Sequence, residues 1–431
     1  KRFEKFHSKI SFIKERVTET LGDLYGMHWP YKQHKTSRNQ KKLPYHEELK
    51  EAGAFFGAVA GYERPMWFSL NEQNPKINYS YNYQNWYPSV EYETKNTRKN
   101  VGLFDLTPFA KFELKGELSH SELQRICTAN IKNEKGKTTY TQMLNSDGGI
   151  ESDLTVVCLD KNYFRIVSSA AVRVHDKHHI LKHLDSKVEF KDVTEEQACL
   201  GIFGPKSRAL MTEISGKYFE NRDFPFATGK NITIEGIKIW AQRLSYVGEL
   251  GWELYIPVKD SNKIYNAIIQ IGKKYNLCNA GVHAMDTLRM EKGYLHWGHD
   301  ISPAENPFEA GLSFATKLNK KEDFIGKEYL IKNKNIKRKK LFMFILNDSS
   351  PGNPLLLHDE PIYYDSKIIG ETTSGNYSFL YKKNIAYGYI KERISLDHTK
   401  AVFEIEVAKK KYKAIVLSQP LHDPENKFMI S

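Results

Sequence analysis

Two kinds of sequence feature are scarce in this chain. No apolar run approaches the ~20 residues that a membrane-spanning helix needs, so we expect a protein that does not cross a membrane. The four cysteines are scattered, which argues against a disulfide scaffold and a zinc site and fits a reducing compartment. A secretory signal is also missing. Because the chain begins at Lys1 rather than at methionine, we expect that a further portion of the protein precedes it.

The composition does supply enough apolar residues for sizeable cores. Of 431 residues, 40% are apolar and 13% are aromatic, which excludes a disordered chain and suggests two or three domains. The net charge of +12 favours anionic ligands, although a lysine-rich proteome would give the same excess. The densest basic run, residues 334–340, lacks interleaved aromatic residues, so we interpret it as a solvated linker and expect no nucleic-acid partner.

Two helices are predicted from residue spacing. Residues 1–25 carry apolar side chains at intervals of three and four, which predicts an amphipathic helix that needs a partner. Residues 169–184 predict a second helix that is rich in histidine. It offers no carboxylate or cysteine at ligand spacing, so we expect a solvated face and no metal.

Residues 140–157 predict the most informative hairpin of the chain. An apolar segment leads into Asn-Ser-Asp-Gly-Gly, which is turn chemistry, and a β-branched strand follows. Asp153 stands between the turn and that strand. It is either a solvated strand end or a functional acid at a cavity rim, and the spacing alone favours the solvated interpretation.

Two stretches resemble known families. The run GGIESDLTV resembles the tetrahydrofolate-binding hairpin of the glycine-cleavage T-protein superfamily. The runs LYGMHWP and LPYHEELKEAGAFFGAVAGYERPMWF resemble the connector between the flavin half and the folate half of the FAD-dependent dimethylglycine and sarcosine dehydrogenases. T-proteins carry two adjacent aspartates in the hairpin, whereas this chain has Ser152 and Asp153, so only the second aspartate remains.

The resemblance implies a set of site residues. It makes Asp153 the catalytic acid or base beside the folate nitrogens. It makes Glu249, in the motif YVGELGWEL, the carboxylate that accepts two N–H groups from the pterin edge; the alternative is a solvated acid in a glycine-rich turn. The other predicted folate contacts are Tyr246, Tyr140, Met143, Asn145 and Gly204. Tyr246 is equally compatible with a core position, and we assign Glu253 to a structural role.

A third motif, residues 281–294, departs from the T-protein pattern. Met285 stands where T-proteins have an arginine, so one ligand-facing charge is missing. This departure favours the amine-dehydrogenase branch of the resemblance. We expect Arg289 and Glu291 to brace the helix rather than to touch a ligand.

The fold class that the resemblance implies is α+β. It consists of a T-protein-like folate-binding domain with mixed and antiparallel sheets and helices, followed by a small C-terminal β-barrel or jelly-roll-like unit. We place the helical connector at residues 1–62, the folate domain at residues 63–333 and the barrel at residues 334–431.

The implied function is one-carbon transfer to tetrahydrofolate, forming 5,10-methylenetetrahydrofolate, within a dimethylglycine- or sarcosine-like dehydrogenase. The expected partners are folate, including its polyglutamylated forms, and an FAD-binding half or subunit, since no G-x-G-x-x-G strand–helix unit occurs in this chain. The alternatives are a stand-alone T-protein-like aminomethyltransferase or demethylase, and a non-catalytic folate-binding or regulatory subunit. We expect a bacterial cytoplasm or, in a eukaryote, the mitochondrial matrix.

Overall fold

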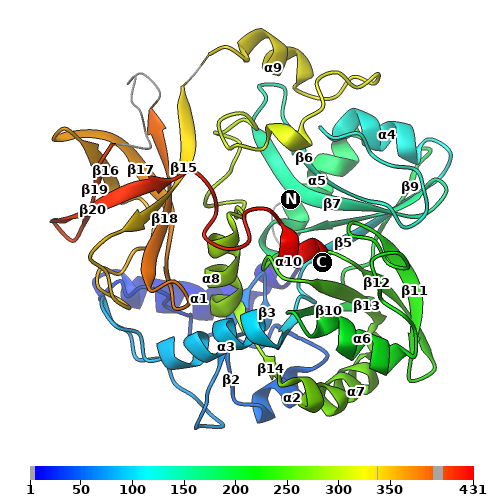
Figure 1. The fold of residues 1–431 in the computed structure, drawn as a ribbon, viewed down its shortest axis with the longest axis horizontal. Helices are drawn as coiled ribbons and strands as arrows, with labels where there is room; N and C mark the ends of the chain where they lie inside the picture. Colours follow the sequence, from blue (N-terminus) through cyan, green and yellow to red (C-terminus); the bar gives the residue numbers. More distant parts are fainter. Residues whose placement is uncertain (1–4, 337, 392–400) are drawn as a thin grey trace.

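A computed structural model describes residues 5–336, 338–391 and 401–431. The strands of this part form a three-stranded, a five-stranded and a six-stranded sheet and a closed barrel (Figure 1). None of the helices in the described part combines the length and the hydrophobicity that crossing a bilayer would need.

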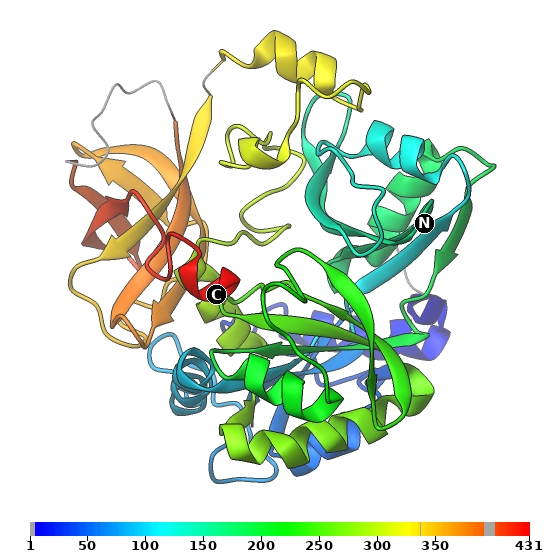
Figure 2. The ribbon, with the colours of Figure 1, turned by 45° about the vertical axis from the view of Figure 1, so that its right-hand side comes forward.

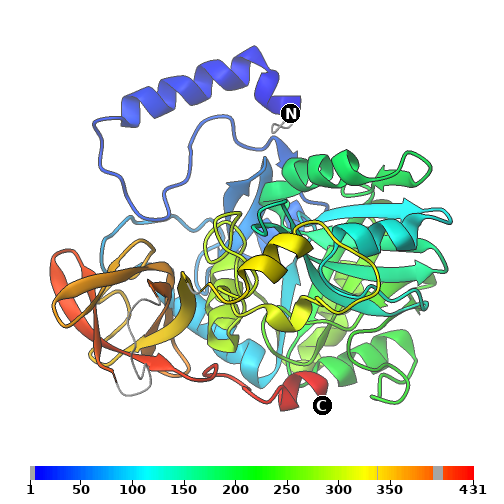
Figure 3. The ribbon, with the colours of Figure 1, turned by 90° about the horizontal axis from the view of Figure 1, so that it is seen from above.

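The chain begins with a helix whose apolar side faces solvent. The predicted amphipathic helix is confirmed as α1 (Ile10–Asp23), which follows a short 3-10 turn, η1 (Lys5–Ser8). Figure 3 shows α1 lying outside the main body of the molecule. Its side chains Ile10 and Leu21 are 84% and 64% exposed. Phe12 packs edge-on against Phe6, with ring centroids 5.2 Å apart, and the rest of the apolar side stays open to solvent.

The connector continues as a small sheet that packs against the main body. It contains β1 (Lys41–Lys42), α2 (His46–Glu51), β2 (Ala54–Val59) and β3 (Tyr62–Phe68), in the order β1-β3-β2. The buried carboxylate of Glu93 in α3 (Tyr87–Lys99) accepts the backbone N–H of Phe68 at 2.7 Å and that of Gly281 at 2.8 Å. Glu93 thus fixes β3 beside the start of α8 (Val282–Lys292).

Two sheets build the central body. The six-stranded sheet has the order β11-β12-β13-β10-β4-β14 and the five-stranded sheet the order β6-β7-β8-β5-β9 (Figure 2). The strands are β4 (Val101–Asp105), β5 (Ala110–Lys115), β6 (Thr138–Leu144), β7 (Ile150–Asp160), β8 (Tyr163–Ser168), β9 (Glu189–Asp192), β10 (Gln197–Phe203), β11 (Gly229–Ile234), β12 (Ile237–Gln242), β13 (Gly251–Pro257) and β14 (Leu277–Asn279). Their helices are α4 (Ser119–Ile126), α5 (Arg173–His183), α6 (Ser207–Ser215) and α7 (Ser261–Gly272). A hydrophobic cluster joins the sheets, with Phe203 and Tyr255 from the first and Val157 from the second.

The C-terminal strands close into a barrel, as predicted, with the order β15-β18-β17-β16-β19-β20. The strands are β15 (Lys339–Leu346), β16 (Pro361–Tyr364), β17 (Lys367–Ser378), β18 (Lys383–Lys391), β19 (Phe403–Val407) and β20 (Lys410–Leu417), and α9 (Lys327–Asn333) precedes them. After the barrel the chain returns to the central body, where α10 (Lys427–Ile430) lies beside the sheets (Figure 1). The α+β class is confirmed, whereas the domain limits at residues 62 and 333 stay a prediction.

Candidate active site

The β6–β7 hairpin positions Asp153. Gln142 and Asp153 are directly opposite each other in its register, so both side chains point to the same face of the sheet. The Gln142 side-chain amide donates a 2.8 Å hydrogen bond to Oδ1 of Asp153. At the turn, Oδ1 of Asn145 accepts the backbone N–H groups of Asp147 and Gly149. Asn145 therefore shapes the turn, and its side chain does not reach Asp153 in the described structure.

Asp153 is a desolvated acid with neutral hydrogen-bond donors. Burial raises the pKa of its carboxyl group to about 6, and the donors Gln142 and Tyr140 oppose that rise. The negative charge of Asp176 adds to the rise. Although protein surrounds the carboxylate, the side chain keeps part of its surface accessible. Such a group lies in a recess, where it can exchange a proton near neutral pH.

Tyr246 and Tyr140 lie close to Asp153. Tyr246 donates a 2.8 Å hydrogen bond from its hydroxyl to the Leu295 carbonyl, and its ring stacks on Tyr294 with centroids 6.1 Å apart. Burial raises the pKa of the Tyr246 hydroxyl, and the charges of Asp286 and Asp153 also act on it. Tyr140 lies within electrostatic reach of both Asp153 and Tyr246. The structure thus brings three of the predicted site residues together.

Glu249 lies in different surroundings, and the ligand role predicted for it stays a prediction. Its Oε1 is 3.0 Å from Nη1 of Arg98 and 2.7 Å from Nε2 of His422, and its side chain is 4% exposed. Arg98 is held in turn by Glu291 at 2.8 Å. Accepting a ligand's paired N–H groups would require Glu249 to leave a buried ion pair, so we assign it to the framework that joins α3, α8 and the C-terminal tail.

Met143 and Gly204 also have structural roles. Met143 is fully buried in the core of the five-stranded sheet and pairs with Ser152, so alternation turns it away from the face of Asp153. Gly204 has φ +137°, and a Cβ there would meet the Asn100 carbonyl oxygen at 2.3 Å. It permits the close approach of β10 to the end of α3. These placements do not favour the two predicted ligand contacts, which stay predictions.

Glu253 is a buried acid to which the sequence analysis assigned a structural role, and it faces the sheet that carries Asp153. Glu253 is 7% exposed and accepts a 2.7 Å hydrogen bond from the Tyr255 hydroxyl. It pairs with Gln242, so both side chains share one face, and the Gln242 side-chain amide donates to the Thr138 hydroxyl in β6. Thr138 alternates onto the same face as Gln142 and Asp153.

The pKa of Glu253 is shifted by its surroundings. Burial raises the pKa of its carboxyl group, while the Tyr255 hydroxyl and the charge of Lys111 oppose the rise. Period-two alternation along β6 and β13 could have identified Gln142 and Glu253 from the sequence.

Helix α8 adds an acid that the sequence analysis did not select. Asp286 accepts from Nε of Arg289 at 2.8 Å and from the Asn376 amide at 3.1 Å, yet 37% of its side chain stays exposed. Arg289 also binds the buried Asp300 at 2.6 Å. The predicted bracing role of Arg289 agrees with this ion-pair network. Since the charges of Asp286 and Asp153 both act on Tyr246, Asp286 lines the same region.

The histidine-rich helix α5 is less solvated than predicted. His175 lies between two acids, 3.0 Å from Oε2 of Glu151 and 3.0 Å from Oδ1 of Asp176, which is fully buried. These acids raise the pKa of His175. His179 is 9% exposed, and burial lowers its pKa to about 4. The face of α5 that carries these two histidines therefore packs on the sheet behind Asp153.

Family models match most of the chain. The GCVT N-terminal domain matches residues 45–320, and the glycine cleavage T-protein C-terminal barrel domain matches residues 339–423. The FAD dependent oxidoreductase central domain matches residues 1–42.

Individual proteins are similar over nearly the whole chain. The 4-methylaminobutanoate oxidase (formaldehyde-forming) of Paenarthrobacter nicotinovorans is 34% identical over 98% of this chain and 51% of its own length. The mitochondrial dimethylglycine dehydrogenase of Homo sapiens is 32% identical over 95% of this chain and 47% of its own length. The chain therefore spans about half the length of these relatives. The crystal structure of the glycine cleavage system aminomethyltransferase T from Bartonella henselae matches the fold, with TM-score 0.76, 22% identity, and coverage of 89% of this chain and 99% of the other.

Proposed function

Since the chain belongs to the glycine cleavage T-protein family, as the T-protein-like half of the FAD-dependent dimethylglycine and sarcosine dehydrogenases, we propose that it transfers a one-carbon unit to tetrahydrofolate. The unit would come from the methyl group of an N-methyl amine. The observation that carries the proposal is Asp153, a partly accessible and desolvated acid within reach of Tyr246.

Asp153 is proposed as the proton acceptor. Bound tetrahydrofolate supplies the nitrogen that takes up the one-carbon unit, giving 5,10-methylenetetrahydrofolate. With a pKa of about 6, the carboxyl group of Asp153 is mostly ionised at neutral pH and can take the proton that this nitrogen loses. The hydrogen bond from Gln142 fixes the orientation of the carboxylate.

The residues around Asp153 fit a flat pteridine ligand. A pterin edge offers two neighbouring N–H groups, which one carboxylate can accept together. We propose Glu253 for this contact in place of Glu249, because Glu253 faces the sheet of Asp153 and has one neutral donor, Tyr255, among the described residues. The ring of Tyr246 and the hydroxyl of Tyr140 would complete the contacts.

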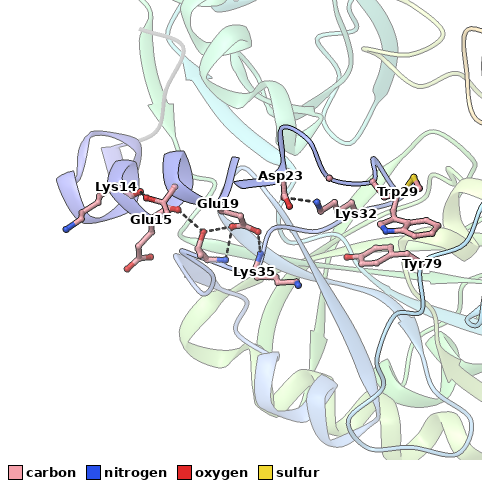
Figure 4. A pocket seen from close by; sticks show the side chains of 12 residues that line it. Lys14, Glu15, Glu19, Asp23, Trp29, Lys32, Lys35 and Tyr79 are labelled. Atoms are coloured by element: carbon pink, nitrogen blue, oxygen red, sulfur yellow. Dashed lines mark hydrogen bonds and ion pairs between the residues drawn. The ribbon is translucent and has the colours of Figure 1, made fainter. Parts of the chain in front are cut away.

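We propose that the flavin is held by the other half of the protein or by a second subunit. The match of residues 1–42 to an FAD oxidoreductase domain supports this, as does the exposed apolar side of α1. Polar contacts tie α1 down, including 2.6 Å and 3.0 Å hydrogen bonds from the Lys35 and Thr36 backbones to Glu19 (Figure 4). The polar side of α1 and the segment behind it also line a hollow of about 780 Å³. The apolar side of α1 stays exposed and is available to the flavin half.

The name of one relative favours a second candidate function. That relative is described as formaldehyde-forming, so this chain could belong to an enzyme that releases the one-carbon unit as formaldehyde. The two candidates differ in whether tetrahydrofolate is bound and used.

The test is to supply the chain with tetrahydrofolate and formaldehyde and to follow 5,10-methylenetetrahydrofolate above the uncatalysed rate. We expect an acceleration, together with saturable binding of 5-formyltetrahydrofolate in titration calorimetry. Binding without acceleration would favour a non-catalytic folate-binding subunit. Absence of both effects would favour formaldehyde release and contradict the proposal.

A further inference from the structure

Arg64 is a half-buried cation that the proposed transfer chemistry does not use. It lies on β3, within the stretch that matches the GCVT N-terminal domain, and its residue pair across the sheet is Gly57. Burial lowers the pKa of its guanidinium to about 10. The charge nevertheless stays on the side chain at neutral pH, because this pKa is still well above 7.

Arg64 has no hydrogen-bond partner to offset this burial. Its Nε is buried without a partner, whereas its terminal nitrogens keep accessible surface and make neither a hydrogen bond nor an ion pair within residues 5–336, 338–391 and 401–431. The one charge that acts on it noticeably is that of Asp286. A guanidinium that protein surrounds on most sides, with its terminal N–H groups accessible and no fixed anion paired to them, is free to bind the anion of a ligand.

The neighbours of Arg64 leave its charge available. Both oxygens of Asp286 already accept hydrogen bonds, from Arg289 and from Asn376. His283 stacks on Trp86, with ring centroids 4.0 Å apart, and burial lowers its pKa to about 4, so it adds no charge at neutral pH.

Arg64 lies on a strand that packs against α8, because Met66 of β3 and Ala284 of α8 belong to one hydrophobic cluster. Asp286 of α8 acts electrostatically on Arg64 and on Tyr246, as Asp153 does on Tyr246. On α8, the residue before Asp286 is Met285, and T-proteins have an arginine at the position of Met285. Strand β3 therefore brings a guanidinium to the helix that has lost this arginine.

We propose that Arg64 binds a carboxylate of the ligand in this site, through the two-pronged contact that a guanidinium makes with a carboxylate. The inference rests on the proposed function, because that function supplies two carboxylate-bearing molecules: the glutamyl tail of folate and an N-methyl amino acid. In either case the substrate class is a carboxylate, and β3 is part of the folate site.

The experiment compares Arg64→Gln and Arg64→Lys with a control, Arg222→Gln, at an arginine whose side chain is 90% exposed. Titration calorimetry measures binding of 5-formyltetrahydrofolate, of the primary amide of 5-formyltetrahydropteroate (the pteroate below), which has neither the glutamate nor any other carboxylate, and of dimethylglycine. Thermal unfolding of the free variants is recorded in parallel.

We expect Arg64→Gln to lower the affinity for one carboxylate ligand at least about tenfold. Arg64→Lys should lower this affinity less, and Arg222→Gln should leave it unchanged. Selective weakening of the folate over the pteroate identifies the glutamyl tail, and selective loss of dimethylglycine identifies an amino acid. The melting temperature of Arg64→Gln should equal or exceed that of the unmodified chain, because a half-buried charge with no paired anion is gone.

Three results would overturn the proposal. One is binding of all three ligands by Arg64→Gln with unchanged affinity. Another is equal weakening of folate and pteroate with dimethylglycine unaffected. The third is failure of both Arg64 variants to fold, which would make the residue structural. If the unmodified chain binds neither folate nor pteroate, the proposed function fails, while dimethylglycine binding still reports on Arg64.

Discussion

Asp153 and Glu249 are two acids next to glycine-containing turns, and their surroundings differ in kind. Neutral groups, Gln142 and Tyr140, donate to Asp153, and its pKa is raised to about 6. Glu249 instead lies against Arg98 and His422 in a buried ion pair. Burial makes an acid reactive only where no fixed cation neutralises it, so the first environment suits proton transfer and the second suits a structural joint.

The largest expected effect is on catalysis at Asp153. Asparagine keeps the shape of the side chain but cannot take a proton, so Asp153→Asn should lower the methylene-transfer rate by about 10²–10⁴-fold. Stopped-flow measurement of 5,10-methylenetetrahydrofolate checks this. Asp147→Asn, at an exposed position of the same turn, is the matched control. An unchanged transfer rate in Asp153→Asn would exclude Asp153 as the proton acceptor.

The next effect is on stability at Glu249. Glu249→Gln removes the anion beside His422 and leaves Arg98 with Glu291 alone, so the free energy of unfolding in urea should fall by about 3 kcal/mol. Glu425→Gln, at a side chain that is 66% exposed, should change it little. If Glu249→Gln kept normal stability but lost folate binding, Glu249 would be a ligand contact, and its contrast with Asp153 would not hold.

A smaller effect is expected on folate affinity at Glu253. If its carboxylate accepts the pterin N–H groups, Glu253→Gln should weaken 5-formyltetrahydrofolate binding by about 1.5–3 kcal/mol in titration calorimetry. The exposed Glu235 provides the control substitution, Glu235→Gln. Equal affinities for the two variants would exclude Glu253 from the ligand contacts.

The smallest effect is expected at Met143. Because its side chain is in the core and turned away from Asp153, Met143→Leu should cost less than about 1.5 kcal/mol in unfolding free energy and leave folate affinity unchanged. A clear loss of affinity in a stable Met143→Leu protein would mean that the site extends through the sheet.

The sequence was informative where structure is local. The residues around Asn145 predict the hairpin because turn chemistry and β-branched strands are read over a few positions. Strand-length patterns predict the barrel for the same reason. Alternation, applied strictly, would also have excluded Met143 and selected Gln142 and Glu253.

The surroundings of Glu249 could not be predicted from the sequence alone. Arg98 is 151 positions away along the chain, and His422 lies beyond the barrel. Only the fold brings these groups to Glu249, and no local pattern indicates that they neutralise it. The unpaired Arg64 was missed for the same reason, since its lack of partners depends on how β3 meets α8.

The pH dependence of methylene transfer tests the central claim most directly. A base with a pKa of about 6 is active when ionised, so the transfer rate should rise as pH increases through about 6 and level off above it. The residual rate of Asp153→Asn should lack this rise. A flat profile in the unmodified chain, or the same rise in Asp153→Asn, would contradict the assignment of Asp153 as the proton acceptor.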